Sequence, residues 1–120
     1  MRTLLSCLVV CAVLLTSASF GEATSKDGPR RWTKVLKKKT TVEYKIMYVA
    51  GKDPAEFAVI GDGGTDVDIY VTDSKGIKVT ADTNNTDLAL VRWNVTFSQV
   101  YTIRVVNLGD EDNECLMGHN

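Results

Sequence analysis

Cysteine, histidine and proline are scarce in this chain of 120 residues, which has three cysteines, one histidine and two prolines. Two of the cysteines, Cys7 and Cys11, lie in an apolar segment near the start, so only Cys115 remains beyond it. If export removes that segment, no disulfide can form within one chain. Cys115 is then either a buried thiol on a final strand or a link between two chains, and we expect the buried thiol.

The scarcity of histidine and cysteine also limits catalysis and metal binding. A zinc site needs three or four nitrogen or sulfur ligands, and the chain beyond the apolar segment offers only His119 and Cys115. No serine or cysteine nucleophile has a suitable base, because the one histidine is the penultimate residue, where chain ends usually fray. We therefore expect a protein that is not an enzyme, with an enzyme on an unfamiliar β scaffold as the residual alternative.

The apolar run from Leu4 to Leu15 is too short to span a bilayer, which takes about 20 residues. It follows the short, positively charged start Met1-Arg2-Thr3 and precedes small residues. This pattern predicts a signal peptide over residues 1–21, with cleavage within 19–23. We expect a secreted, periplasmic or cell-envelope protein; a retained N-terminal anchor is the alternative.

Charge of the two signs is unevenly distributed along the remaining chain. Residues 26–45 hold eight basic residues against two acidic ones, whereas residues 46–120 hold five basic residues against twelve acidic ones. This split predicts a basic linker or N-terminal arm over residues 22–40 and an acidic domain over residues 41–120. Residues 32–39 fit either one amphipathic helical turn or an extended edge segment, and we favour the extended segment because the rest of the chain has β character.

The basic run of the arm is a candidate site for an anionic partner. Its residues are Arg30, Arg31, Trp32, Lys34, Lys37, Lys38 and Lys39. Cationic side chains attract an anionic polymer, and Trp32 can stack on a ring of that polymer. In an exported protein we expect an acidic polysaccharide or lipid headgroups, and no nucleic acid; the alternative is a solvated linker with no partner.

The most regular pattern is the stretch Gly61 to Gly76, where Val67, Ile69 and Val71 alternate with polar residues after a glycine-rich turn. A period of two indicates a half-buried strand. Asp73-Ser74-Lys75-Gly76 fits a type I turn, and the strand that follows makes the pair a β-hairpin.

Further strands are expected over residues 41–49, 55–60, 88–97, 99–107 and 114–117. In the strand expected over residues 88–97, the inner face should carry Ala89, Val91, Trp93, Val95 and Phe97. About seven strands separated by short turns, with no convincing helix, predict an all-β fold. We expect an antiparallel β-sandwich in Greek-key or jelly-roll order.

Three blocks of the sequence resemble the bacterial pre-peptidase C-terminal domain. Residues 61–76 resemble its hairpin motif, Val91-Arg92-Trp93 with residues 101–107 its tryptophan strand and the strand after it, and residues 113–120 its closing strand. The resemblance covers about Tyr44 to Asn120. It implies a secreted β-sandwich module that accompanies extracellular enzymes, and in some members binds calcium or a polymeric substrate.

Asp62, Asp66, Asp68 and Asp73 are the candidate metal ligands, and calcium is the possible cofactor. Calcium takes six to eight oxygen ligands. In the alternative interpretation, which we favour, Asp66 and Asp73 accept backbone hydrogen bonds in turns while Asp68 faces water.

The sequence thus favours a non-catalytic, exported binding or accessory module that contacts an extracellular polymer or protein. The alternative is a calcium-stabilised structural module with no ligand of its own.

Overall fold

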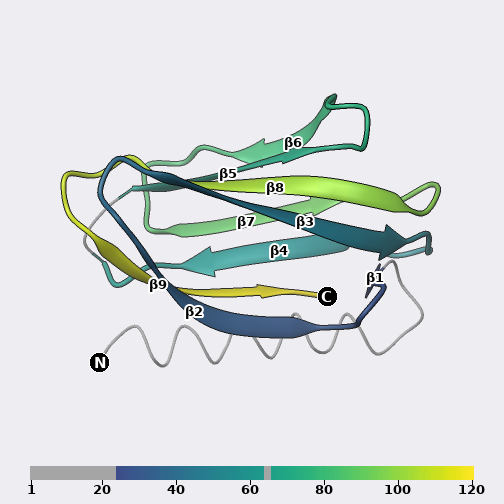
Figure 1. Ribbon diagram of the computed structural model, residues 1–120, viewed down its shortest axis with the longest axis horizontal. Helices are drawn as coiled ribbons and strands as arrows, with labels where there is room; N and C mark the ends of the chain where they lie inside the picture. Colours follow the sequence, from purple (N-terminus) through teal and green to yellow (C-terminus); the bar gives the residue numbers. More distant parts are fainter. Residues whose placement is uncertain (1–23, 64–65) are drawn as a thin grey trace.

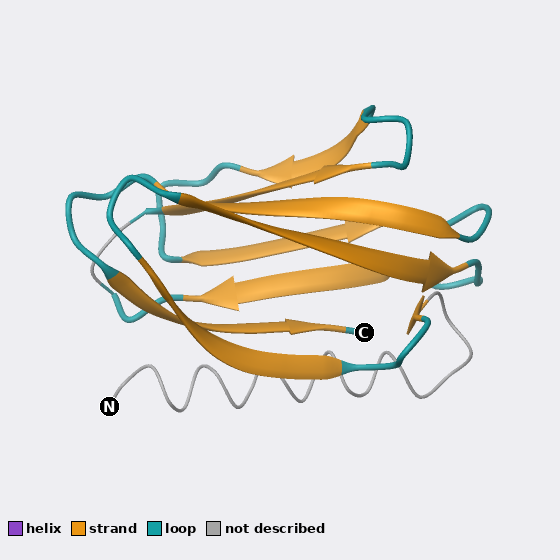
Figure 2. Ribbon diagram, viewed as in Figure 1, coloured by secondary structure: helices purple, strands orange, loops and turns teal. Residues whose placement is uncertain are grey.

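The computed structural model describes residues 24–63 and 66–120. Over these residues the chain forms strands and loops and no helix (Figure 2). The strands are β1 (Thr24–Ser25), β2 (Arg30–Leu36), β3 (Thr41–Val49), β4 (Ala55–Ile60), β5 (Val67–Thr72), β6 (Lys78–Asp82), β7 (Leu88–Trp93), β8 (Gln99–Asn107) and β9 (Asn113–His119). The expected all-β fold is confirmed.

Two antiparallel sheets contain these strands, in the orders β1-β3-β8-β5-β6 and β2-β9-β4-β7. From β2 to β5 the chain changes sheet at each connection, and β5 and β6 form the expected hairpin (Figure 1). Apart from the two-residue β1, this is the strand order of an eight-stranded jelly roll. The predicted sandwich in Greek-key or jelly-roll order is therefore confirmed, with one more long strand than expected.

That additional strand is β2, which lies within the segment expected to be a linker or arm. β2 pairs with β9 along its whole length, from Arg30 opposite His119 to Leu36 opposite Asn113. Leu36 is buried in the core, and Trp32 packs against the core cluster. The sheet therefore begins before residue 41, and the extended-edge interpretation is correct for residues 32–36.

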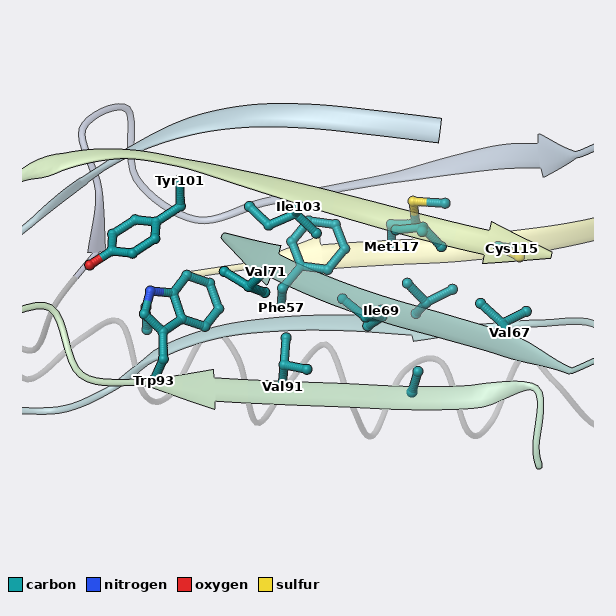
Figure 3. Close-up of a cluster of buried hydrophobic side chains, with 14 of the residues drawn as sticks. Phe57, Val67, Ile69, Val71, Val91, Trp93, Tyr101, Ile103, Cys115 and Met117 are labelled. Atoms are coloured by element: carbon teal, nitrogen blue, oxygen red, sulfur yellow. The ribbon is translucent and has the colours of Figure 1, made fainter. Parts of the chain in front are cut away.

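The core lies between the inner faces of the two sheets, where alternate side chains from both sheets meet (Figure 3). Val67, Ile69 and Val71 are completely buried, as their alternation predicts. Phe97 does not join them: β7 ends at Trp93, and the Phe97 side chain is 57% exposed. The expected strand over 88–97 is too long because the chain turns after Trp93, and burial continues only to Val95.

The turn between β5 and β6 has the predicted residues in the predicted roles. The amide of Gly76 donates to the carbonyl of Asp73 at 3.0 Å, and Gly76 has a positive φ of 81°. The Asp73 carboxylate accepts hydrogen bonds from the amides of Lys75 and Ile77 at 2.9 and 3.0 Å. Asp73 thus stabilises the turn, which is what the turn-capping interpretation predicts.

A tight contact joins the end of β4 to the start of β9. The Oδ1 atom of the completely buried Asn113 accepts a hydrogen bond from the Asp62 amide at 2.9 Å. In return, the Asp62 carboxylate accepts one from the Glu114 amide at 3.1 Å. A Cβ atom added at Gly61 would lie 2.7 Å from Asn113 Oδ1, which is closer than van der Waals contact allows. Glycine at position 61 therefore leaves room for Asn113.

We expect the substitution Gly61→Ala to lower the free energy of unfolding by about 1–3 kcal/mol, since the new methyl group displaces Asn113 from its hydrogen bonds. Urea denaturation measures the change. The double variant with Asn113→Ala is the control, because removing the amide removes the clash. The costs of the two substitutions should then add to more than the cost of the double variant; full additivity would contradict this explanation.

Candidate binding groove at the open edge of the sandwich

A groove lies at one edge of the sandwich, between β2 of one sheet and β3 of the other. β2 is the edge strand of its sheet, and on the outer side of β3 the short β1 pairs only with Tyr48 and Val49. We call this cavity the edge groove. It has a volume of about 270 Å³ and is lined by Arg30, Trp32, Tyr44, Lys45, Ile46 and His119.

The aromatic side of the edge groove is held by contacts with the core. Trp32 packs edge-on against Tyr44, Phe57 and His119, with ring centroids 5.1, 5.9 and 5.7 Å apart. Its indole Nε1 donates to the Tyr44 hydroxyl at 3.2 Å. Because Trp32 and Tyr44 are only half-buried, the part of each ring that does not face the core is open to a ligand.

Arg30 supplies positive charge to the same groove. It lies directly opposite His119 in the β2–β9 pairing, so the two side chains are on the same face of the sheet. Among the described residues Arg30 forms no ion pair. A second cavity of about 130 Å³ adjoins the groove and shares Arg30, Lys45, Ile46 and His119 with it. Lys26 and Asp27 also line that cavity.

His119 connects the edge groove to the aromatic core. Its ring stacks on Phe57 at 6.2 Å and meets Tyr48 edge-on at 6.1 Å. Burial lowers the pKa of His119 below its ordinary value of 6.5. The hydrogen bond to the Asn120 main chain partly offsets this effect, and the nearby charge of Arg30 lowers the pKa further. The imidazole is therefore neutral at pH 7.

The tautomer of His119 follows from the hydrogen bond to Asn120. Nδ1 lies 2.8 Å from the Asn120 carbonyl oxygen, which can only accept, so Nδ1 carries the proton. In the neutral ring Nε2 is then a hydrogen-bond acceptor. The groove thus offers a cation, an aromatic surface and an acceptor together.

The expectation that His119 frays at the end of the chain is wrong. His119 is 5% exposed, and Asn120 beyond it is completely buried. The Asn120 side chain accepts from the Glu56 amide at 2.9 Å and donates to the Pro54 carbonyl at 3.2 Å. These bonds hold the end of β9. The alternation of Cys115 and Met117, both buried, could have placed His119 on the inner face.

The structure divides the predicted basic site into separate parts. Arg30 and Trp32 line the edge groove, and Lys34 lies on the same face of β2 by alternation, whereas Arg31 lies on the opposite face. Sequence analysis missed Tyr44, Lys45, Ile46 and His119, although alternation in the 41–49 strand turns Tyr44 and Ile46 inward.

The basic residues after β2 contact an acidic loop of the same molecule instead. Lys37 pairs with Asp112 at 3.3 Å, and Lys39 pairs with Asp110 at 3.4 Å. The amide of Lys38 donates to Asp112 at 2.9 Å, and this bond is the main cause that lowers the pKa of the Asp112 carboxyl. The charges of Lys37 and Lys39 are thus partly neutralised within the chain.

The four candidate metal ligands are also separated. Asp62 and Asp73 accept backbone hydrogen bonds, whereas Asp66 and Asp68 lie near each other at the start of β5. Over residues 24–63 and 66–120 no group of three or more histidine, cysteine or acidic residues is arranged to hold a metal ion. The metal site therefore remains a prediction.

Asp68 differs from the favoured interpretation. Asp68 is 4% exposed and does not face water. Its Oδ2 accepts a hydrogen bond from the Tyr70 hydroxyl at 3.2 Å, but its Oδ1 and the Oδ1 of Asp66 are buried without a hydrogen-bond partner in the described part of the chain. Burial raises the pKa of Asp68, and the neighbouring Asp66 carboxylate raises it further.

The expected signal peptide lies outside the described residues. In the part of the chain that the structure describes, no helix is long and apolar enough to cross a membrane. Cys115 is a completely buried thiol on β9, which confirms the buried-thiol prediction.

No protein-family model matches this chain, and no curated protein matches it. Among solved structures, the Yersinia pseudotuberculosis-derived mitogen is similar, with 13% identity and a TM-score of 0.54, over 78% of this chain and 85% of the mitogen. PliG of Aeromonas hydrophila, a periplasmic inhibitor of g-type lysozyme, has 11% identity and a TM-score of 0.48, over 86% and 90% of the two chains. The CBM36-1 domain of a multidomain xylanase from the hindgut metagenome of Trinervitermes trinervoides has 11% identity and a TM-score of 0.40, over 82% and 94%. The likeness to the mitogen shows a shared fold and carries no statement about function.

We expect Asp68→Asn to stabilise the protein at pH 7 by about 1 kcal/mol, since it removes a buried charge with an unpartnered oxygen. A carboxyl whose pKa rises on folding contributes most stability below its ordinary pKa of 3.8, and this contribution is lost as the pH rises through the folded pKa. The gain should therefore shrink as the pH falls from 7 toward 3.8.

Thermal melts in a chelator at several pH values measure this difference. Asp53→Asn is the matched control, because Asp53 is exposed in the turn before β4 and its charge has no burial cost. An Asp68→Asn gain that is the same at every pH would show that the Asp68 charge is not its cause.

Proposed function

We propose that this protein is an exported, non-catalytic module that binds an extracellular polymer or protein in the edge groove. The observation that carries the proposal is the lining of that groove. Half-buried aromatic rings, an arginine with no ion pair among the described residues and a neutral histidine face one cavity at the open edge of the sandwich. Aromatic surfaces with a few convergent polar groups are typical of binding sites.

Two features of the sequence support export and a binding role. The predicted signal peptide over residues 1–21 implies a secreted, periplasmic or cell-envelope location. The only histidine is used for packing against Phe57 and for a bond to the Asn120 carbonyl.

We also propose membership in the pre-peptidase C-terminal family. The blocks that carry the resemblance correspond to the β5–β6 hairpin, to β7 with β8, and to β9. Asn113 and Asn120 are the first and last residues of the third block, and both are buried and hydrogen-bonded. Their structural roles support the resemblance, since the motif positions hold strands in place.

The proposal predicts that Arg30→Ala weakens retention on a binding polymer, whereas Arg31→Ala does not. Both arginines are exposed residues of β2, but only Arg30 lines the edge groove. Loss of one charge-assisted contact should weaken binding by about tenfold. Affinity electrophoresis against an array of cell-wall and matrix polymers measures retention of the protein and both variants.

Trp32 provides an independent signal, because the chain has only two tryptophans and the other, Trp93, is buried. Ligand binding should change the fluorescence of the wild-type protein, and Trp32→Phe should abolish the change. Equal losses in the two arginine variants, or retention by none of the polymers, would reject the edge groove as a polymer site.

A calcium-stabilised module is the second candidate. The Oδ1 atoms of Asp66 and Asp68, which have no hydrogen-bond partner in the described part of the chain, favour it. These two oxygens would be part of the six to eight that calcium takes. Calcium at about 100 times its dissociation constant should add about 2.7 kcal/mol to the free energy of unfolding. Melts in calcium and in chelator measure this, and Asp68→Asn should lose the difference. An unchanged melting midpoint for the wild type rejects the site.

A further inference from the structure

We propose that the edge groove binds one ring of an acidic saccharide, a hydroxylated ring that bears a carboxylate or sulfate group. This inference rests on the proposed binding function and names the class of ligand. Arg30 would take the anionic group, His119 Nε2 would accept a ring hydroxyl, and the half-buried aromatic side chains would cover an apolar face of the ring.

The size of the groove favours a single ring. Its volume of about 270 Å³ lies just below the range of about 300–1,000 Å³ of pockets that hold drug-sized ligands. The groove continues into the second cavity of about 130 Å³ past Arg30 and His119. A polymer can therefore place one ring in the groove and continue along the sheet edge.

The charge of the groove favours an anionic ligand. Arg30, Lys45 and Lys26 line the two cavities against one acidic residue, Asp27. A guanidinium donates two parallel hydrogen bonds to a carboxylate or sulfate, so Arg30 selects a group with at least two oxygens. Unlike Lys37 and Lys39, Arg30 has no acidic partner among the described residues that would have to be displaced.

His119 adds the requirement for a hydroxyl group. Nδ1 is committed to the Asn120 main-chain oxygen. Nε2 is therefore the ring nitrogen that remains to meet a ligand in the groove, which His119 lines. A ligand atom beside Nε2 must therefore donate a hydrogen bond. A sugar hydroxyl can donate, whereas a polyphosphate chain has only acceptor oxygens at pH 7, so Arg30 and His119 together select a ring that is both anionic and hydroxylated.

The apolar lining accounts for the third part of the recognition. Trp32, Tyr44 and Ile46 come from two different sheets and form one side of the groove. Sugar rings have an apolar face of C–H groups that covers aromatic carbon, and burial of that area stabilises the complex. The Tyr44 hydroxyl accepts from the Trp32 indole, so its own hydrogen remains available for a ligand oxygen.

Two matched pairs of polymers test the inference with the full-length protein: dextran sulfate with dextran, and polygalacturonate with its methyl ester. Inorganic polyphosphate is the fifth probe. Titration calorimetry at about 0.15 M salt limits non-specific attraction. We expect the acidic member of at least one pair to bind about tenfold more tightly than its neutral member and than polyphosphate. The pair that shows the difference distinguishes sulfate from carboxylate.

Variants connect the selectivity to the groove. Arg30→Ala should remove the difference between the acidic and neutral polymers, and Arg31→Ala should keep it. His119→Phe retains a ring against Phe57 but removes the acceptor. It should weaken binding of the acidic polysaccharide about fivefold and leave binding of polyphosphate unchanged. A melting midpoint and a near-ultraviolet spectrum confirm that each variant is folded.

The outcomes separate this inference from the proposed function. Two results would overturn the acidic-saccharide inference but retain a polymer site in the groove. One is equal binding of polyphosphate and acidic polysaccharide. The other is tighter binding of the neutral polymers that Arg30→Ala abolishes. Binding that Arg30→Ala and Arg31→Ala weaken equally would reject the groove itself.

Discussion

Buried asparagine side chains at the two ends of β9 are the constraint on which the rest of this structure depends. Asn113 bonds to the backbone beyond β4, and Asn120 bonds to the backbone before and within β4. Both are completely buried. Because a buried amide that loses its partners costs free energy, these bonds fix the register of β9 against β4. Asn107 has a similar role at the end of β8, where its side chain donates to the carbonyls of Leu36 and Glu111.

The fixed position of β9 determines the edge of the sandwich. β9 lies between β4 and β2, so it supplies the pairing edge that incorporates the basic segment as a strand. It also brings His119 opposite Arg30 and against Phe57. The groove exists because, over residues 24–63 and 66–120, no strand lies beyond β2 and the short β1 covers only the end of β3. The open edge of a jelly roll thereby becomes a lined cavity.

Charge is distributed by the same geometry. Alternation along β2 sends Arg30 to the groove and Arg31 to the outer face of the sheet, while the turn after Leu36 places Lys37 and Lys39 beside the acidic loop. The acidic residues divide likewise: Asp73 stabilises a turn, whereas Asp68 is buried beside Asp66 with a raised pKa. A run of like charge in the sequence is therefore not a single surface in the fold.

The sequence by itself determined the all-β class, the alternation of the core strands and the hairpin with Asp73 and Gly76, because these follow from local side-chain periodicity and turn chemistry. It also placed Cys115 in the interior. Tertiary structure alone decided that residues 30–36 join a sheet, that Asp68 is buried and that His119 faces a cavity with Trp32 and Tyr44. Each of these depends on pairing or packing between segments far apart in the chain, here β2 with β9 and β3 beside them. Local pattern restricts which face a side chain occupies, but it does not say which distant strand will lie against that face.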